Sequence, residues 1–138
     1  MIPLSLGGSS TPEPLNPAAP AALLVTRDLM IESRVVGSGT PLGVRVLAVS
    51  DVRQGLQTAD PGVKLILFDL SLGTDGLSEL VGHWQLGRRV PVLAFGSHVA
   101  TALLEAARSA GCHEVFPRSR LHGQLTEILR EYAFDCEA

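Results

Sequence analysis

Short apolar runs and segments with helical spacing alternate along the chain from residue 21 onward. The apolar runs are rich in Val, Leu and Ile, and polar residues do not alternate with them. Continuous runs of this length are typical of strands that are buried on both faces, as in a parallel sheet. Four runs are clear and a fifth is weaker: Ala22–Thr26, Val44–Val49, Lys64–Leu70, Val90–Phe95 and Glu114–Phe116. We therefore expect five buried strands.

Segments with a helical apolar face lie between and after these runs. The faces comprise Leu77, Leu80, Val81 and Trp84; Ala102, Leu103, Ala106, Ala107 and Ala110; and Leu121, Leu125, Ile128, Leu129 and Tyr132. Residues 28–42 are expected to form the first crossover, a helix that ends in a Gly-rich turn, and Asp51 is placed to cap the next helix. Five repeats of strand then helix predict an α/β fold with a parallel sheet and right-handed crossovers.

The first twenty residues have a different composition, with five of the nine prolines and several Gly and Ser residues. Such a segment buries too little apolar area to offset the entropy lost on ordering. We expect residues 1–20 to form a flexible leader, with packing on a neighbouring subunit as the alternative. Residues 21–138 are then the α/β domain.

Charge and composition exclude several classes of protein. The chain has 138 residues and a formal net charge of −3, and ten of its eleven basic residues are Arg. A nucleic-acid binder or a polybasic membrane anchor needs clustered positive charge, which this sequence lacks. No apolar run approaches the roughly 20 residues of a membrane-spanning helix, and the start lacks the features of a secretory signal. A cytoplasmic protein with reduced thiols is expected.

Candidate functional residues follow from the predicted sheet. In parallel sheets, ligands and chemistry collect at the carboxyl ends of the strands. The polar and small residues that follow the predicted strands are Thr26, Arg27 and Asp28, then Asp69, then Gly96, Ser97 and His98, and finally Arg118. We expect these residues to lie along one edge of the sheet.

Several sequence stretches together resemble the receiver domain of bacterial response regulators, over roughly residues 21–134. They are LILFDLSL at 65–72 with its Gly/Asp-containing loop at 73–76, PVLAFGS at 91–97, and AARSAGCHEVFPRS at 106–119. The resemblance implies a doubly wound, flavodoxin-like sheet of order 2-1-3-4-5 with helices on both faces. It places Asp69 at the position of the phospho-accepting aspartate and implies a role in two-component signalling or a phosphorelay.

The auxiliary positions of that family are altered. Receivers bind Mg²⁺ through the phospho-acceptor and an acidic pair after the first strand, but here the pair is Thr26-Arg27, and Asp28 follows one residue later. This exchange changes the formal charge of the site by about +3, and one unit charge a few Å from another is worth on the order of several kcal/mol at an effective dielectric near 20. We therefore expect no Mg²⁺ site of the usual kind, and we expect Arg27 to pair with Asp69 instead.

The hydroxyl and Lys positions of the family are altered too, and their roles stay open. Gly96 stands at the hydroxyl position with Ser97 after it, so Ser97 is either a displaced switch hydroxyl or the cap of the fourth helix. Arg118 stands at the Lys position, either as a phosphate sensor or partner of Asp69, or as a solvated loop residue. Asp69 itself is either a phospho-acceptor or a retained structural acid.

These observations favour a stand-alone, non-enzymatic signalling module that interacts with proteins and has lost Mg²⁺-dependent phosphorylation. The first alternative is an active receiver in which Asp28 and Asp69 bind Mg²⁺. The second is a small flavodoxin-like nucleotide or flavin binder, suggested by Gly37, Gly39 and Gly43. No resident cofactor is expected under the first hypothesis.

The resemblance also implies a partner surface on the fourth helix, fifth strand and fifth helix. In this chain that face comprises Arg118, Arg120, Leu121, Gln124 and Ile128. The expected partner is a protein, either a histidine kinase or a downstream signalling protein, or a second copy of the chain. Nucleic acid and membrane are not expected partners.

Overall fold

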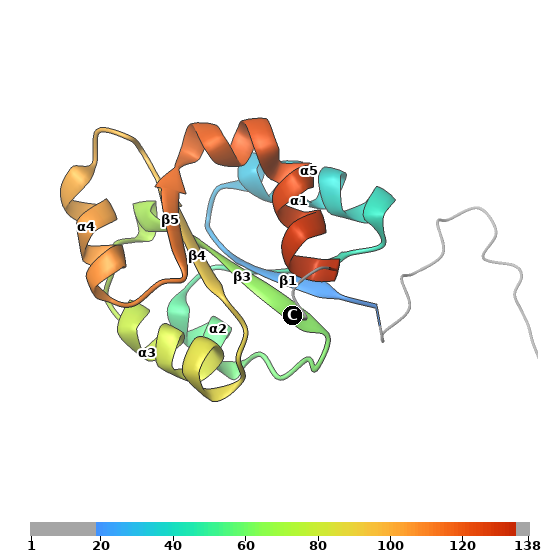
Figure 1. Cartoon of the computed structure of the whole chain (residues 1–138), viewed down its shortest axis with the longest axis horizontal. Helices are drawn as coiled ribbons and strands as arrows, with labels where there is room; N and C mark the ends of the chain where they lie inside the picture. Colours follow the sequence, from blue (N-terminus) through green and yellow to red (C-terminus); the bar gives the residue numbers. More distant parts are fainter. Residues whose placement is uncertain (1–18, 135–138) are drawn as a thin grey trace, which may run out of the picture.

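The computed structural model describes residues 19–134, which form a parallel sheet between two layers of helices (Figure 1). The strands are β1 (Ala21–Val25), β2 (Arg45–Val49), β3 (Val63–Asp69), β4 (Val92–Gly96) and β5 (Glu114–Pro117). Every pairing is parallel, and the order is β2-β1-β3-β4-β5. The predicted fold class and strand order are confirmed.

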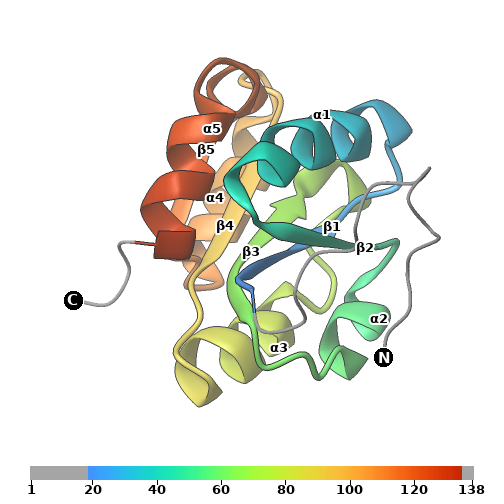
Figure 2. The same ribbon diagram turned by 90° about the vertical axis from the view of Figure 1, so that its right-hand side faces the viewer.

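Helices cover both faces of the sheet. The main helices are α1 (Leu29–Gly39), α2 (Val52–Gln57), α3 (Leu77–Val81), α4 (Thr101–Ser109) and α5 (Arg118–Phe134). Helices α1 and α5 lie side by side on one face, and α2, α3 and α4 cover the other (Figure 2). Short segments complete the crossovers: η2 (Thr40–Leu42), η3 (Leu70–Leu72) and η4 (Gly82–Gly87), the last being a π-helical continuation of α3.

Successive strand residues pack into two separate cores. In β1, Leu23 contributes to the core beneath α2, α3 and α4, whereas Leu24 contributes to the core beneath α1 and α5. In β3, Phe68 and Leu67 divide in the same way. Each face of a central strand needs apolar residues, which explains the continuous apolar runs of the sequence. The edge strand β2 is the exception, because its residues are only half-buried or exposed.

Most predicted local features are present. Asp51 caps α2 as predicted. Asp28 caps α1, which was not predicted, and Gly111 has a φ of 96° after α4, where a left-handed residue ends the helix. The predicted face of α5 is buried throughout. In α4, Ala107 of the predicted face is buried and Leu103, Ala106 and Ala110 are half-buried, but Ala102 is exposed, and Leu104, which was not predicted, is buried.

The predicted leader falls mainly outside the described residues, which begin at Ala19. The carbonyl oxygens of Ala19 and Pro20 accept hydrogen bonds from the side chain and the backbone of Arg45, so the chain is fixed just before β1. None of the helices between residues 19 and 134 combines the length and apolar character that crossing a bilayer requires.

Candidate functional site around Asp69

Asp69 is the last residue of β3, at the carboxyl edge of the sheet, and its side chain is fully buried. Both carboxylate oxygens accept hydrogen bonds. The Thr26 hydroxyl donates to Oδ2 at 2.7 Å, and the Ser71 backbone N–H donates to Oδ1 at 2.9 Å. The Arg118 guanidinium donates to Oδ1 through Nη2 at 3.3 Å. The carboxylate is therefore enclosed by three donors from different segments of the chain.

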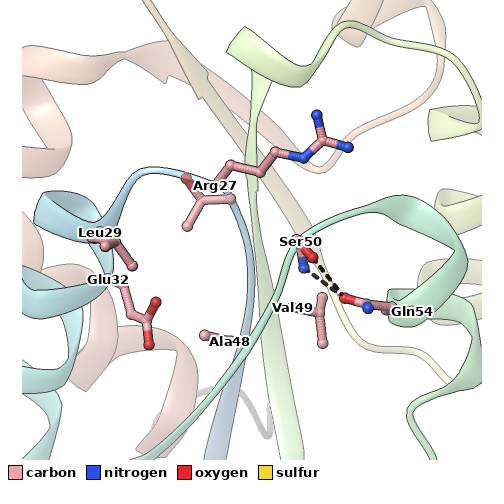
Figure 3. A pocket seen from close by; sticks show the side chains of 8 residues that line it. Arg27, Leu29, Glu32, Ala48, Val49, Ser50 and Gln54 are labelled. Atoms are coloured by element: carbon pink, nitrogen blue, oxygen red, sulfur yellow. Dashed lines mark hydrogen bonds between the residues drawn. The ribbon is translucent and has the colours of Figure 1, made fainter.

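Local structure explains why Thr26 rather than Arg27 faces Asp69. The Thr26 N–H donates to the carbonyl of Val49 at 2.9 Å, so residue 26 still follows the β1–β2 pairing. Successive residues of an extended chain point to opposite sides. The Thr26 side chain is accordingly buried and that of Arg27 exposed. Figure 3 shows the Arg27 side chain extending away from Leu29 and Glu32.

The expected pair between Arg27 and Asp69 is therefore wrong, and Arg118 is the cation that pairs with Asp69. Arg118 is the first residue of α5, directly after β5, and one third of its side chain is exposed. Its Nε atom is buried and has no hydrogen-bond partner among the described residues. Of the two roles left open for Arg118, the structure shows it as the partner of Asp69.

Asp28 does not complete a metal site. Its Oδ1 atom accepts the backbone N–H groups of Met30 at 2.9 Å and Ile31 at 3.3 Å, as the cap of α1. Its own backbone N–H donates to the Thr26 hydroxyl. Between residues 19 and 134 there is no group of three or more His, Cys, Asp or Glu side chains that could hold a metal ion. Mg²⁺ prefers several oxygen ligands, so a lone carboxylate bonded to a guanidinium does not fit it.

The residues after β4 form an exposed turn. Gly96 is buried, and a Cβ there would lie 3.1 Å from the Cβ of Leu70. Ser97 and His98 are exposed. The Ser97 hydroxyl accepts the N–H of Val99 at 3.3 Å, whereas α4 begins four residues after Ser97. Ser97 thus closes a local turn, and the prediction that it caps the fourth helix is wrong.

Two cavities lie at the carboxyl ends of β1 and β2, on either side of Arg27. The larger, about 300 Å³, includes Thr26, Arg27, Leu29, Glu32, Ser50 and Gln54 in its lining (Figure 3). The smaller, about 200 Å³, has Asp51, Arg53 and Asp75 together with Arg27. Sequence reasoning did not single out Ser50 or Gln54. The rule that ligands collect at strand ends, applied to β2, would have found Ser50.

Two of the three glycines that suggested a phosphate loop, Gly39 and Gly43, have structural roles. Gly37 and Gly39 lie within α1, and Gly43 has a φ of 79° at the end of η2. A Cβ at Gly39 would lie 3.1 Å from the carbonyl oxygen of Val44, so this glycine lets the helix approach β2. The glycines therefore give no separate support for a nucleotide or flavin site.

Only some residues of the expected partner surface are exposed. Leu121 and Ile128 are buried in the core beneath α1 and α5, so including them in that surface was wrong. Gln124 is exposed. Arg120 donates to Glu114 at 2.8 Å and lies over the Phe116 ring, 5.0 Å from its centroid, so part of its side chain is fixed against the fold.

Comparison of the structure with solved structures identifies the fold. A phosphorylated cyanobacterial phytochrome response regulator, RcpA, is similar with a TM-score of 0.69 and 14% identity, covering 86% of this chain and 96% of that one. A response regulator from Hahella chejuensis has a TM-score of 0.70 at 13% identity, covering 87% and 99%. The chain has the fold of response-regulator receiver domains.

One of the similar structures contains a bound metal ion. The receiver domain of a sensor histidine kinase from Pseudomonas aeruginosa, solved with magnesium in its active-site cleft, has a TM-score of 0.64 at 22% identity, covering 83% of this chain and 98% of that one. At the sequence level, no family model and no curated protein matches the chain. The receiver fold is thus present with a sequence that is only 14%, 22% and 13% identical to those of these three structures.

Proposed function

We propose that this chain is a receiver-like signalling module that acts through protein contacts, without Mg²⁺-dependent phosphorylation of Asp69. The observation that carries the proposal is the enclosure of the Asp69 carboxylate. It is fully buried, and Thr26, Ser71 and Arg118 occupy its two oxygens. A phospho-acceptor needs an oxygen with a free line of approach to the phosphorus atom.

Electrostatics oppose a metal at the same place. Arg118 carries a fixed positive charge against Asp69. The neighbouring cavity is lined by Arg27 and Arg53 as well as by Asp51 and Asp75, so it adds no net negative charge that would attract a cation. A divalent cation about 5 Å from one guanidinium is repelled by on the order of several kcal/mol at an effective dielectric of 20. The Arg118 guanidinium also neutralises Asp69, the carboxylate that would have to attract the ion. The structure thus favours a permanently paired acid over a switchable one.

Protein partners are supported by a structural neighbour. The CheA3 P1 domain in complex with CheY6 from R. sphaeroides matches this chain with a TM-score of 0.63 at 22% identity. We propose that this chain also binds a protein, either a different protein or a second copy of itself. We place the chain in the cytoplasm. Leu29 and Met30, about three quarters exposed at the start of α1, are apolar side chains available for such a contact.

The proposal is tested by NMR titration of the full chain with Mg²⁺ and beryllofluoride, a mimic of the phosphoryl group. We expect the amide signals of Asp69, Ser71 and Ser97 to stay unchanged through the titration. Saturable shifts that need both reagents, and that vanish in Asp69→Asn, would contradict the proposal. They would instead support the active receiver in which Asp28 and Asp69 bind the metal, and Asp28→Asn would then abolish them too.

A further inference from the structure

The largest of the three cavities described lies at the amino-terminal edge of the sheet, opposite Asp69. We call it the basal cleft. It has a volume of about 710 Å³ and lies beside the starts of β3 and β4, the residue before β5, and the last turns of α5. Its charged and aromatic lining residues are Lys64, Arg88, Arg89, His113, Glu131 and Tyr132. The volume is within the range of clefts that hold a ligand or a short peptide.

The basal cleft carries positive charge on a protein that is negative overall. Lys64, Arg88 and Arg89 face a single acidic lining residue, Glu131, whereas the whole chain has a net charge of −3. No ion pair within residues 19–134 involves any of these three cations. The nearby Asp60 carboxylate is already bonded to Arg45. Arg88 lies close enough to Asp60 to help lower the pKa of its carboxyl, so its charge is partly compensated. Lys64 and Arg89 have no ion-pair partner among the described residues, which favours an acidic occupant.

One of the cations, Arg88, is held in place by its contacts, and the backbone of a second, Arg89, has an unusual conformation. The Arg88 guanidinium lies over the Trp84 ring, 4.4 Å from its centroid, and donates to the carbonyl oxygen of Asp60. Arg89 has a φ of 61°, the left-handed conformation that glycine adopts far more easily, directly after η4. The turn is closed by the Val90 N–H, which donates to the Trp84 carbonyl at 2.7 Å. Arginine at this strained position keeps a cation at the rim of the cleft.

We propose that the basal cleft binds an acidic peptide and that its occupant is the segment 135–138 of this chain. Helix α5 is described up to Phe134, and its residues Glu131 and Tyr132 line the cleft, so the segment that follows is attached beside it. The next residues are Asp-Cys-Glu-Ala, which add two carboxylates. Four extended residues span about 13 Å. Because the segment is tethered at the cleft, even weak ion pairs give it a high effective concentration there.

The sequence supplies a probe for the test. Cys136 lies in the proposed occupant and can carry a nitroxide spin label in a Cys112→Ser background. We expect the label to broaden the amide signals of Lys64, Arg89 and His113 in the chain of residues 1–138. The double variant Asp135→Asn/Glu137→Gln should reduce the added relaxation rate at these amides at least threefold. The control Glu79→Gln/Glu127→Gln, which removes two charges from exposed helical positions, should leave it unchanged.

The cleft side is tested with Arg89→Gly, which removes the cation and relieves the left-handed strain, so the variant should fold at least as well as the parent. Broadening should fall in this variant too. The proposal would be overturned if the broadening were equal in the parent chain, in Asp135→Asn/Glu137→Gln, in Arg89→Gly and at high salt. Tethering alone would then bring the label near the cleft. The proposal would also be overturned if a separate acidic peptide bound the parent as tightly as it binds Asp135→Asn/Glu137→Gln, since the cleft would then be open to a partner.

Discussion

Asp69 is the only charged side chain that the structure buries completely within residues 19–134, so its contacts decide what its carboxylate can do. Removing one member of a buried ion pair is costly because the other charge is left without compensation. Arg118 is one third exposed, which reduces that cost through solvent screening. The Thr26 and Ser71 donors remain in either case. The pair with Arg118 is therefore a structural interaction whose strength is measurable.

We predict that Arg118→Met destabilises the protein by about 2 kcal/mol, because it leaves the Asp69 carboxylate buried without its cation. In the double variant Asp69→Asn/Arg118→Met, the loss should be smaller than the sum of the two single losses by about 1–2 kcal/mol. Urea unfolding of the four proteins measures this coupling. Arg130→Met, at an exposed position of the same helix, is the control and should change stability by less than about 0.5 kcal/mol. Additive losses would mean that Arg118 and Asp69 do not interact in solution.

A second ion pair predicts how stability depends on pH. The Arg45 guanidinium donates to Asp60 at 2.6 Å and 3.0 Å and lowers the pKa of this carboxyl from 3.8 to about 2. The unfolded chain therefore takes up the proton first as the pH falls. The stabilisation is complete above about pH 4 and is lost as the pH falls toward 2.

Asp60→Asn should accordingly cost about 1–2 kcal/mol at pH 7, less than the full pKa difference implies because the pair is partly solvated. The cost should shrink between pH 4 and pH 2. Urea unfolding at pH 7, 4, 3 and 2 checks this, with Glu127→Gln as the exposed control. A cost that stays the same across this range would show that the ion pair does not stabilise the fold.

At the scale of helices and strands, the sequence predicted nearly all elements because each central strand has to be apolar on both faces. The same reasoning was weaker at the edge, where β2 is half-exposed, and in α4, where a face of small residues fixed the helix orientation poorly. The π-helical end of α3 was not predicted, since apolar spacing alone does not distinguish it from an α-helix. Turns and helix ends were predictable where Asp caps a helix or where Gly adopts a left-handed backbone conformation.

Two glycines at the ends of elements should respond oppositely to the same substitution. Gly111 has a φ of 96°, so Gly111→Ala should cost about 1–2 kcal/mol through backbone strain. Gly82 has helical angles, φ −61° and ψ −45°, with open space around it, so Gly82→Ala should stabilise by about 0.5–1 kcal/mol. Thermal and urea unfolding compare the two variants. If both substitutions changed stability in the same direction, backbone conformation would not be the cause.

At the scale of the whole molecule, the receiver fold and the edge that holds the candidate site were predicted from the sequence, but the contacts within the site were not. The edge was located by the rule that strand ends collect polar residues, and Thr26, Asp69 and Arg118 meet there. The choice between Arg27 and Arg118 as the cation depended on which side chain turns inward after its strand. The direction of each side chain depends on the backbone conformation of a single residue after the strand. The spacing of residues in the sequence does not reveal that conformation. The basal cleft was not predicted at all, because its cations come from separate segments.

If Asp69 is a paired structural acid rather than a phospho-acceptor, it should not be phosphorylated by a small-molecule phosphoryl donor. The full chain is incubated with acetyl phosphate and Mg²⁺ and measured by intact-mass spectrometry, beside Asp69→Asn as the matched control. We expect both proteins to keep their unmodified mass. A phosphorylated species that forms in the parent chain, requires Mg²⁺ and is absent from Asp69→Asn would contradict the account.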